Sequence, residues 1–160
     1  MLLSKRPRIQ HCRACGVAVD YRVPPEDNRE RAMCGGCGHI QYENPLNVVG
    51  TVPVWQDKVL LCRRNIEPRL GFWTLPAGFM ELGESTAEGA QRETDEEAGA
   101  QIELGPLFSL LNVVPVGQVH LFYLAELKSD VFNPGPETIE ARLFSEEAVS
   151  YTHLRAHETL

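Results

Sequence analysis

The chain lacks several features that would place it in familiar classes of protein. Its 160 residues hold no apolar run near the ~20 residues that a membrane span needs, and residues 1–10 lack the apolar core of a signal peptide. No internal repeat is evident. Positive charge is also scarce, with 15 Lys and Arg against 22 Asp and Glu. These absences predict a cytoplasmic protein without a membrane partner, and the net charge of −7 disfavours nucleic acid as a partner.

Cysteine, in contrast, is present in an ordered pattern of two CxxC pairs and one single residue. The pairs are Cys12–Cys15 and Cys34–Cys37, and 18 residues separate them. This spacing is typical of a zinc ribbon, and Gly16 and Gly38 allow backbone amides to turn toward the sulfur atoms. Two local disulfides or a redox CxxC are the alternatives. Four thiolates leave no open coordination position, so the expected Zn²⁺ is structural, while Cys62 is expected to be a buried apolar side chain.

Most of the net negative charge lies in one segment, residues 78–100, which read GFMELGESTAEGAQRETDEEAGA. Seven acids and one base give this segment a charge of 1 − 7 = −6. It fits the pattern G-x5-E-x7-R-E-U-x-E-E-x-G-U, where U is aliphatic, at every fixed position: Gly78, Glu84, Arg92, Glu93, Glu96, Glu97 and Gly99. Only the aliphatic positions depart, with Thr94 and Ala100. A solvated acidic surface is the alternative, but it does not require this spacing.

The same segment predicts a helix over residues 86–98. Ser85 with Glu88 three residues later forms a capping box, and Gly99 is a typical helix stop. At 100° per residue, Glu96 lies about 60° behind Glu93 and Glu97 about 40° ahead of it. Three carboxylates on so narrow a face repel one another, and hard oxygen ligands of this kind favour Mg²⁺ or Mn²⁺. The neighbouring face carries small residues, which favour close packing on a sheet.

Strands are expected on both sides of this helix. The expected strands are 48–55, 58–64, 102–104, 108–114, 119–127 and 141–144, with an extended segment at 72–77. We expect residues 1–10 to be a disordered arm, 11–42 a zinc ribbon and 46–149 the main domain. Residues 150–160 lack an apolar period and are similar to translated adapter sequence, so we expect a non-native tail in place of the true C-terminus.

The acidic pattern resembles the Nudix box, the signature of hydrolases that cut a nucleoside diphosphate linked to another moiety. Over residues 11–148, the chain is similar to the zinc-ribbon branch of that family, which includes ADP-ribose and FAD pyrophosphatases. The resemblance implies an α+β fold, a Nudix α/β/α sandwich with a mixed sheet, preceded by a small N-terminal zinc ribbon. It also implies catalytic Mg²⁺ or Mn²⁺ and a small-molecule nucleotide substrate. Many relatives dimerise, so a homodimer is a further expectation.

The resemblance assigns roles to residues of the box and beyond it. Glu93 and Glu97 would be the first metal ligands, with Glu96 on a second ion and the Ala77 carbonyl nearby. Arg92 would orient the cluster by pairing with Glu84. A general base would come from a distal loop, where the candidates are Glu137 and Glu140, or would be Glu93 itself.

The candidates for substrate binding are the phosphate-reaching Arg63, Arg64 and Arg69, and Trp73 or Phe72 for ring stacking. Solvated arginines and core aromatics are the alternatives, and His39 and His120 are expected to be structural. Pro115 lies 115 − 100 = 15 residues beyond the box, as in ADP-ribose-cleaving relatives, whereas the aromatic and proline array of NADH-cleaving relatives is absent.

The leading hypothesis is therefore a pyrophosphatase that splits ADP-ribose or FAD into AMP and a phosphorylated product. The alternative is a non-catalytic nucleotide-sensing scaffold whose zinc ribbon binds protein or RNA. A messenger-cap hydrolase is a third option, disfavoured because the chain has no broad basic surface.

Overall fold

The computed structural model describes residues 6–150, and the chain divides into two compact units. One unit takes in the chain up to Pro45 together with Pro115–Gly117, and the other takes in Leu46–Val114 and the chain from Gln118. Residues 1–5 of the expected arm and 151–160 of the expected tail lie outside the described residues. Within the described part, no helix is long and apolar enough to span a membrane.

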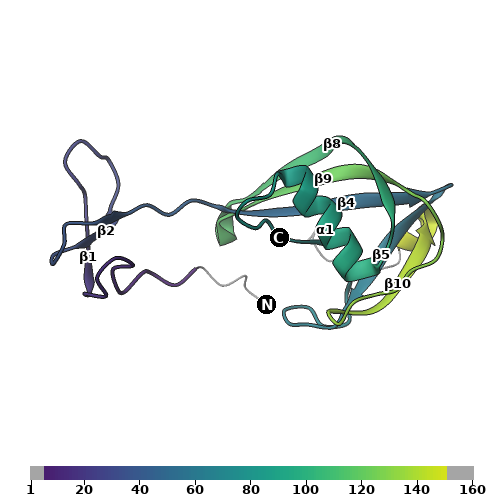
Figure 1. Cartoon of the computed structure of the whole chain (residues 1–160), viewed down its shortest axis with the longest axis horizontal. Coiled ribbons are helices and arrows are strands. Elements are labelled where there is room, and N and C mark those ends of the chain that lie inside the picture. Colours follow the sequence, from purple (N-terminus) through teal and green to yellow (C-terminus); the bar gives the residue numbers. More distant parts are fainter. Residues whose placement is uncertain (1–5, 151–160) are drawn as a thin grey trace. The chain divides into compact units, whose positions relative to one another are not determined.

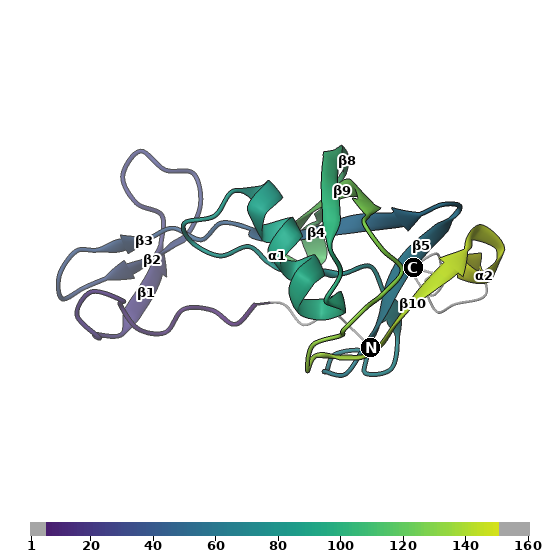
Figure 2. The ribbon, with the colours of Figure 1, turned by 45° about the vertical axis from the view of Figure 1, so that its right-hand side comes forward.

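The first unit is built on a small antiparallel sheet in the order β1-β2-β3. Its strands are β1 (Val19–Arg22), β2 (Arg31–Cys34) and β3 (Ile40–Gln41), as Figure 2 shows. The Arg8 guanidinium lies 4.0 Å from the centre of the Tyr21 ring, and the Ile9 N–H donates to the Tyr21 hydroxyl at 2.9 Å. Residues just before the first cysteine pair are thus attached to this sheet.

The second unit contains a mixed seven-stranded sheet in the order β10-β5-β4-β9-β8, with β6 paired to β5 and β7 to β4. Only β4 and β9 run parallel, and the other pairs are antiparallel. The strands are β4 (Leu46–Trp55), β5 (Lys58–Arg64), β6 (Trp73–Thr74), β7 (Ala77–Phe79), β8 (Ile102–Val113), β9 (Gln118–Leu127) and β10 (Thr138–Ser145). The predicted mixed sheet is confirmed.

Helix α1 (Thr86–Ala98) has the predicted bounds and the predicted caps. The Glu88 N–H donates to the Ser85 hydroxyl at 3.2 Å, and the Ser85 N–H donates to the Glu88 carboxylate at 2.8 Å. Gly99 closes the helix in the left-handed region, with φ of 58°. The helix lies across one face of the sheet (Figure 1), where Ala90 and Ala98 are fully buried. Small side chains therefore bring the helix backbone close to β4.

A buried hydroxyl pair joins this helix to the centre of the sheet. The Oγ1 atoms of Thr51 on β4 and Thr94 on α1 lie 2.6 Å apart, and both residues have no exposed surface. The Thr94 hydroxyl also donates to the Ala90 carbonyl at 2.8 Å. Thr94 thus occupies an aliphatic position of the box because Thr51 gives its hydroxyl a partner.

Residues 102–113 form one strand, β8, where the sequence suggested two separate strands. Its pairing with β9 shifts register between Leu104 and Leu107 and again before Ser109, and these irregularities hid the continuity from the sequence. Four large apolar side chains of this strand each have about half of their surface exposed: Leu107, Phe108, Leu110 and Leu111. After β10, the described chain ends in a five-residue helix, α2 (Glu146–Ser150).

Replacement of the capping serine tests the start of α1. Ser85→Ala removes the acceptor of the Glu88 N–H, so we expect the free energy of unfolding to fall by about 1 kcal/mol. Urea titration followed by circular dichroism measures it. The matched control is Ser109→Ala in β8, which should change stability by less than about 0.5 kcal/mol. Equal effects of the two substitutions would show that the cap contributes nothing specific.

Candidate functional site

The four paired cysteines meet at one point of the first unit. Their sulfur atoms all lie within 4.8 Å of one another, with 3.7 Å between Cys12 and Cys37 and 3.4 Å between Cys15 and Cys34. Zn–S bonds of about 2.3 Å in a tetrahedron would place the sulfur atoms about 3.8 Å apart, so the cluster fits Zn²⁺. All five cysteines of the chain are free, which argues against the disulfide alternative.

Backbone geometry around the cluster also matches a thiolate site. The Ala14 N–H donates to the Cys12 sulfur at 3.4 Å, and the Cys37 N–H donates to the Cys34 sulfur at 3.5 Å. Gly16 and Gly38 have φ of 75° and 74°, a conformation that lets the chain turn back under the sulfur atoms. These N–H groups stabilise negative charge on sulfur, as zinc ligands require.

Metal content tests the cluster directly. We expect about one zinc per chain in the purified protein, because the four sulfur atoms complete a tetrahedral shell. Cys34→Ser should lower the content several-fold, measured by plasma mass spectrometry. Cys62→Ala is the control, since Cys62 lies buried beneath α1 in the other unit, and its zinc content should match the wild type. Zinc-free wild-type protein would contradict the assignment.

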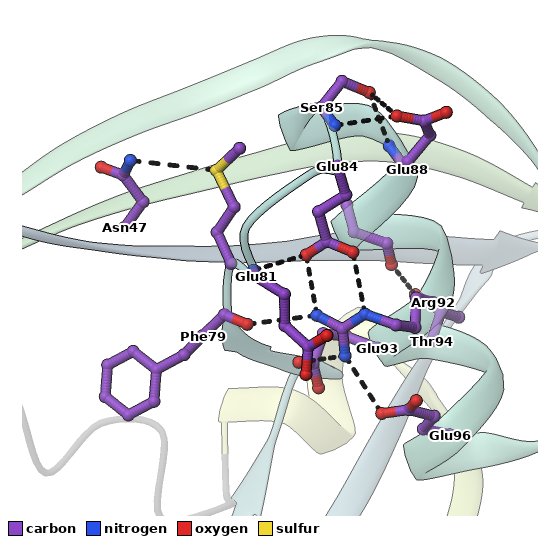
Figure 3. Close-up of polar contacts among 12 residues, drawn as sticks. Asn47, Phe79, Glu81, Glu84, Ser85, Glu88, Arg92, Glu93, Thr94 and Glu96 are labelled. Atoms are coloured by element: carbon purple, nitrogen blue, oxygen red, sulfur yellow. Dashed lines mark hydrogen bonds and ion pairs between the residues drawn. The ribbon is translucent and has the colours of Figure 1, made fainter.

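Arg92 is the centre of the acidic site in the second unit (Figure 3). Its Nε and Nη2 atoms donate to the two carboxylate oxygens of Glu84, each at 2.9 Å. Its Nη1 donates to Glu93 at 2.8 Å and to Glu96 at 3.1 Å, and its Nη2 also donates to the Phe79 carbonyl at 3.1 Å. The expected pair with Glu84 is present. One guanidinium therefore links the loop before α1 to two carboxylates of the helix.

The first glycine of the box makes room for Glu93. The Glu93 carboxylate lies against the backbone of Gly78, so closely that a Cβ at Gly78 would collide with it. Burial raises the pKa of Glu93, and the hydrogen bond and charge of Arg92 oppose that rise. The fixed glycine of the pattern is thus explained by the carboxylate that covers it.

Glu97 lies one helical turn beyond Glu93 and is held by the strand that enters the box. Its Oε2 accepts a hydrogen bond from the Ala77 N–H at 3.0 Å. Burial is the main reason that its pKa rises to about 7, and the charges of Glu93 and Glu137 raise it further. The Arg64 charge acts in the opposite direction. Ala77 therefore contacts this site through its N–H, and the metal-binding role of its carbonyl stays a prediction.

The glutamates suit a hard divalent cation by their chemistry. Glu93, Glu96 and Glu97 offer carboxylate oxygens, the ligands that such a cation prefers, and burial raises the pKa of both Glu93 and Glu97. Their oxygens are less tightly gathered than the cysteine sulfurs, which are the one close set of three or more metal-ligating side chains among residues 6–150. Arg92 contacts Glu93 and Glu96, so the acidic face is held by a guanidinium.

The structure separates the two candidate bases of the distal loop. The loop that carries Glu137 contacts the end of α1, where the Asn133 N–H donates to the Ala98 carbonyl at 3.0 Å and Gly135 lies against the Glu96 carbonyl. In agreement with this position, the Glu137 charge raises the pKa of both Glu93 and Glu97. Glu140 pairs with Arg142 at 3.6 Å. Its neighbour Ala141 packs against the core under α1, and strand alternation therefore directs Glu140 to the opposite face. Of the two, only Glu137 is brought to the acidic site.

The candidate substrate residues lie on different faces of the sheet. The Arg64 charge lowers the pKa of Glu97, and the Arg64 Nε donates to the Pro68 carbonyl at 3.0 Å. Arg63 and Trp73 are register partners on the other face, where the Arg63 Nε donates to the Gly71 carbonyl at 3.1 Å. Arg69 lies in the loop between them, with φ of 69°.

The sequence did not single out Arg142, which covers the aromatic pair of Trp73 and Phe144. The Arg142 guanidinium lies 4.9 Å from the centre of the Trp73 ring and 4.8 Å from that of Phe144. The two rings meet edge to face at 4.8 Å. The signal was an arginine two residues before an aromatic in a strand, which is too common to single out.

His120 fits its structural expectation, because its Nε2 lies 2.9 Å from the Gln118 Oε1 and burial lowers its pKa.

Comparison with known proteins agrees with this geometry. The family model described as NUDIX domain matches residues 45–159, and the model described as Nudix N-terminal, a zinc ribbon, matches residues 10–43. The chain belongs to the Nudix family. Its zinc-ribbon segment and its Nudix segment thus follow one another along the chain, in the order that the sequence suggested.

Several Nudix relatives resemble most of the chain. A Nudix hydrolase of known structure from Nitrosomonas europaea is 44% identical, with a TM-score of 0.84, over 88% of this chain and 80% of its own. The NAD-capped RNA hydrolase NudC of Photobacterium profundum is 26% identical over 86% of this chain and 50% of its own. An ADP-ribose pyrophosphatase of Methanocaldococcus jannaschii is 30% identical over 64% of this chain and 63% of its own. The chain spans about half the length of the NudC relatives.

The raised pKa of Glu97 predicts a pH dependence of stability. Between pH 4.5, its ordinary pKa, and about pH 7, the folded state keeps a proton that the unfolded state releases, so stability falls as pH rises. Without added divalent cation, Glu97→Gln should remove a contribution on the order of 2 kcal/mol from that fall. Urea titration at several pH values measures it. Glu103→Gln, on exposed β8, should keep the wild-type slope, and an unchanged slope in Glu97→Gln would refute the prediction.

Proposed function

We propose that this Nudix protein is a pyrophosphatase, dependent on Mg²⁺ or Mn²⁺, that hydrolyses a nucleoside diphosphate linked to another moiety. The observation that carries the proposal is a pair of carboxylates one turn apart on α1, the buried Glu93 and the half-buried Glu97. Gly78 accommodates the first of them and the Ala77 N–H holds the second. An acidic pair with this support is suited to cation binding and is poorly explained as a solvated surface.

Different residues would have different roles in hydrolysis of the diphosphate. Glu93 and Glu97 would hold the divalent cation, with Glu96 beside them, and the cation would neutralise phosphate charge and activate water. Arg92 keeps its two helix carboxylates from swinging apart, because Glu84 and the Phe79 carbonyl fix its guanidinium. Glu137, on the distal loop, would accept the proton of the attacking water.

The substrate proposal is a dinucleotide that contains ADP, with ADP-ribose or FAD foremost. Names among the relatives include ADP-ribose pyrophosphatase and NAD-capped RNA hydrolase, and both ADP-ribose and NAD carry an adenosine diphosphate linked to a second group. Cleavage between the two phosphates would release AMP from each. NAD(H) therefore joins ADP-ribose and FAD among the compounds to test.

Turnover of these compounds tests the proposal. With Mg²⁺ or Mn²⁺, the protein should release AMP from at least one of them, measured by chromatography of the products. Glu97→Gln should lower kcat by about 10²- to 10³-fold, since the carboxylate acts on the reacting phosphates through the cation. Glu103→Gln is the matched control and should keep wild-type kcat.

The same assay distinguishes the pyrophosphatase from a non-catalytic nucleotide-sensing scaffold. Nucleotide binding by calorimetry without AMP release in either metal would favour the non-catalytic scaffold. Wild-type rates in Glu97→Gln would exclude the acidic pair as the site of the reaction.

A further inference from the structure

The loop between β9 and β10 is fastened to the C-terminal end of α1. The Asn133 N–H donates to the Ala98 carbonyl at 3.0 Å, the last turn of the helix. Gly135 lies so close to the Glu96 carbonyl that a Cβ there would collide with it. In Figure 2 this segment passes the end of α1 and reaches the loop after β5. One side of the loop is therefore set by the helix that carries the acidic pair.

Asn65 fastens the same loop from the sheet side. This residue directly follows β5, and its backbone N–H donates to the Glu137 carbonyl at 2.8 Å. Its side-chain Nδ2 donates to the Pro136 carbonyl at 2.9 Å. Two adjacent carbonyls of the loop are thus held by one residue, immediately before the chain enters β10. Other residues at position 65 could make the backbone bond, whereas the bond to Pro136 needs a side-chain donor such as that of asparagine.

The position of Glu137 depends on these contacts. Its own backbone carbonyl accepts the Asn65 N–H, and the nearby Gly135 lies against the Glu96 carbonyl of α1, so the residue stands beside the helix that carries the acidic pair. A carboxylate on a free loop would sample many positions. Glu137 instead lies on a loop in which the carbonyls of Pro136 and Glu137 both accept hydrogen bonds from Asn65. Small displacements of a reacting group lower rates steeply, by up to about 10²-fold for 1 Å.

We propose that Asn65 is a positioning residue, which holds the loop so that the Glu137 carboxylate faces the acidic pair of α1. The inference rests on the proposed function, in which Glu137 receives a proton. Asn65 does not contact the acidic pair in this arrangement and acts through Glu137. The proposal therefore predicts that the effect of Asn65 on the reaction disappears when Glu137 can no longer accept a proton.

A double-mutant cycle with AMP release as the readout tests this dependence. Asn65→Ala should lower kcat about tenfold, with KM changed less than about twofold, because orientation and not substrate binding is lost. In the Glu137→Gln background the same change should alter kcat less than about twofold. Asn65→Asp, which keeps the shape but loses the N–H donor to Pro136, is the second variant should Asn65→Ala fold poorly. Asn112→Ala on exposed β8 is the matched control and should keep wild-type kcat.

Hydrogen exchange gives a readout independent of turnover. Asn65→Ala should speed exchange of the Glu137 and Thr138 amides, and Asn112→Ala should leave it unchanged. An equal loss of kcat in both backgrounds, or unchanged exchange, would overturn the positioning role. If wild type is active, Glu97→Gln is inactive and both Asn65 variants keep full kcat, the inference alone fails. A wild type without any turnover removes the proposed function, and the inference with it.

Discussion

The acidic site depends on one guanidinium. Arg92 gives both oxygens of Glu84 a donor and still contacts Glu93, Glu96 and the Phe79 carbonyl. Without it, carboxylates on one helical face would repel each other and the loop that precedes the helix would lose its attachment. The pKa values show how the charge is shared. The Arg92 hydrogen bonds hold the pKa of Glu84 at about 2, while burial keeps those of Glu93 and Glu97 above their ordinary range. The arginine thus fixes the frame around Glu84 and Glu93, while Glu97 takes its hydrogen bond from the Ala77 N–H.

Much of this arrangement could be predicted from the sequence, for local reasons. Helix α1 was predicted with its bounds because the capping box and Gly99 are short-range signals. The cysteine cluster was predicted because ligand spacing reflects the geometry of the ion. The strands of the first unit were not predicted, since strands of two to four residues leave no alternation to detect. The separation of Glu137 from Glu140 was not predicted either, because it depends on which face of β10 each residue occupies.

The two faces of the sheet have different chemistry. On the side that α1 covers lie the acidic pair of the helix, Glu137 and Arg64, whereas the other face carries Arg142 over Trp73. Residues adjacent in sequence, Arg63 and Arg64, are therefore sent to different surroundings by strand alternation. The Arg64 charge lowers the pKa of Glu97. Close approaches of backbone at Gly78 and Gly135 complete the acidic side, since each leaves no room for a Cβ.

The hydroxyl pair between Thr51 and Thr94 has a consequence for protein engineering. Design by family consensus would replace Thr94 with an aliphatic residue, to restore the usual letter of the box. That edit would strand the Thr51 hydroxyl in a dry interior, and an orphaned polar atom there is expensive. The two threonines form a unit that must be exchanged together, for example for two aliphatic residues of matching volume. Apparent repair of a motif at one position can therefore weaken a protein whose compensation lies on another strand.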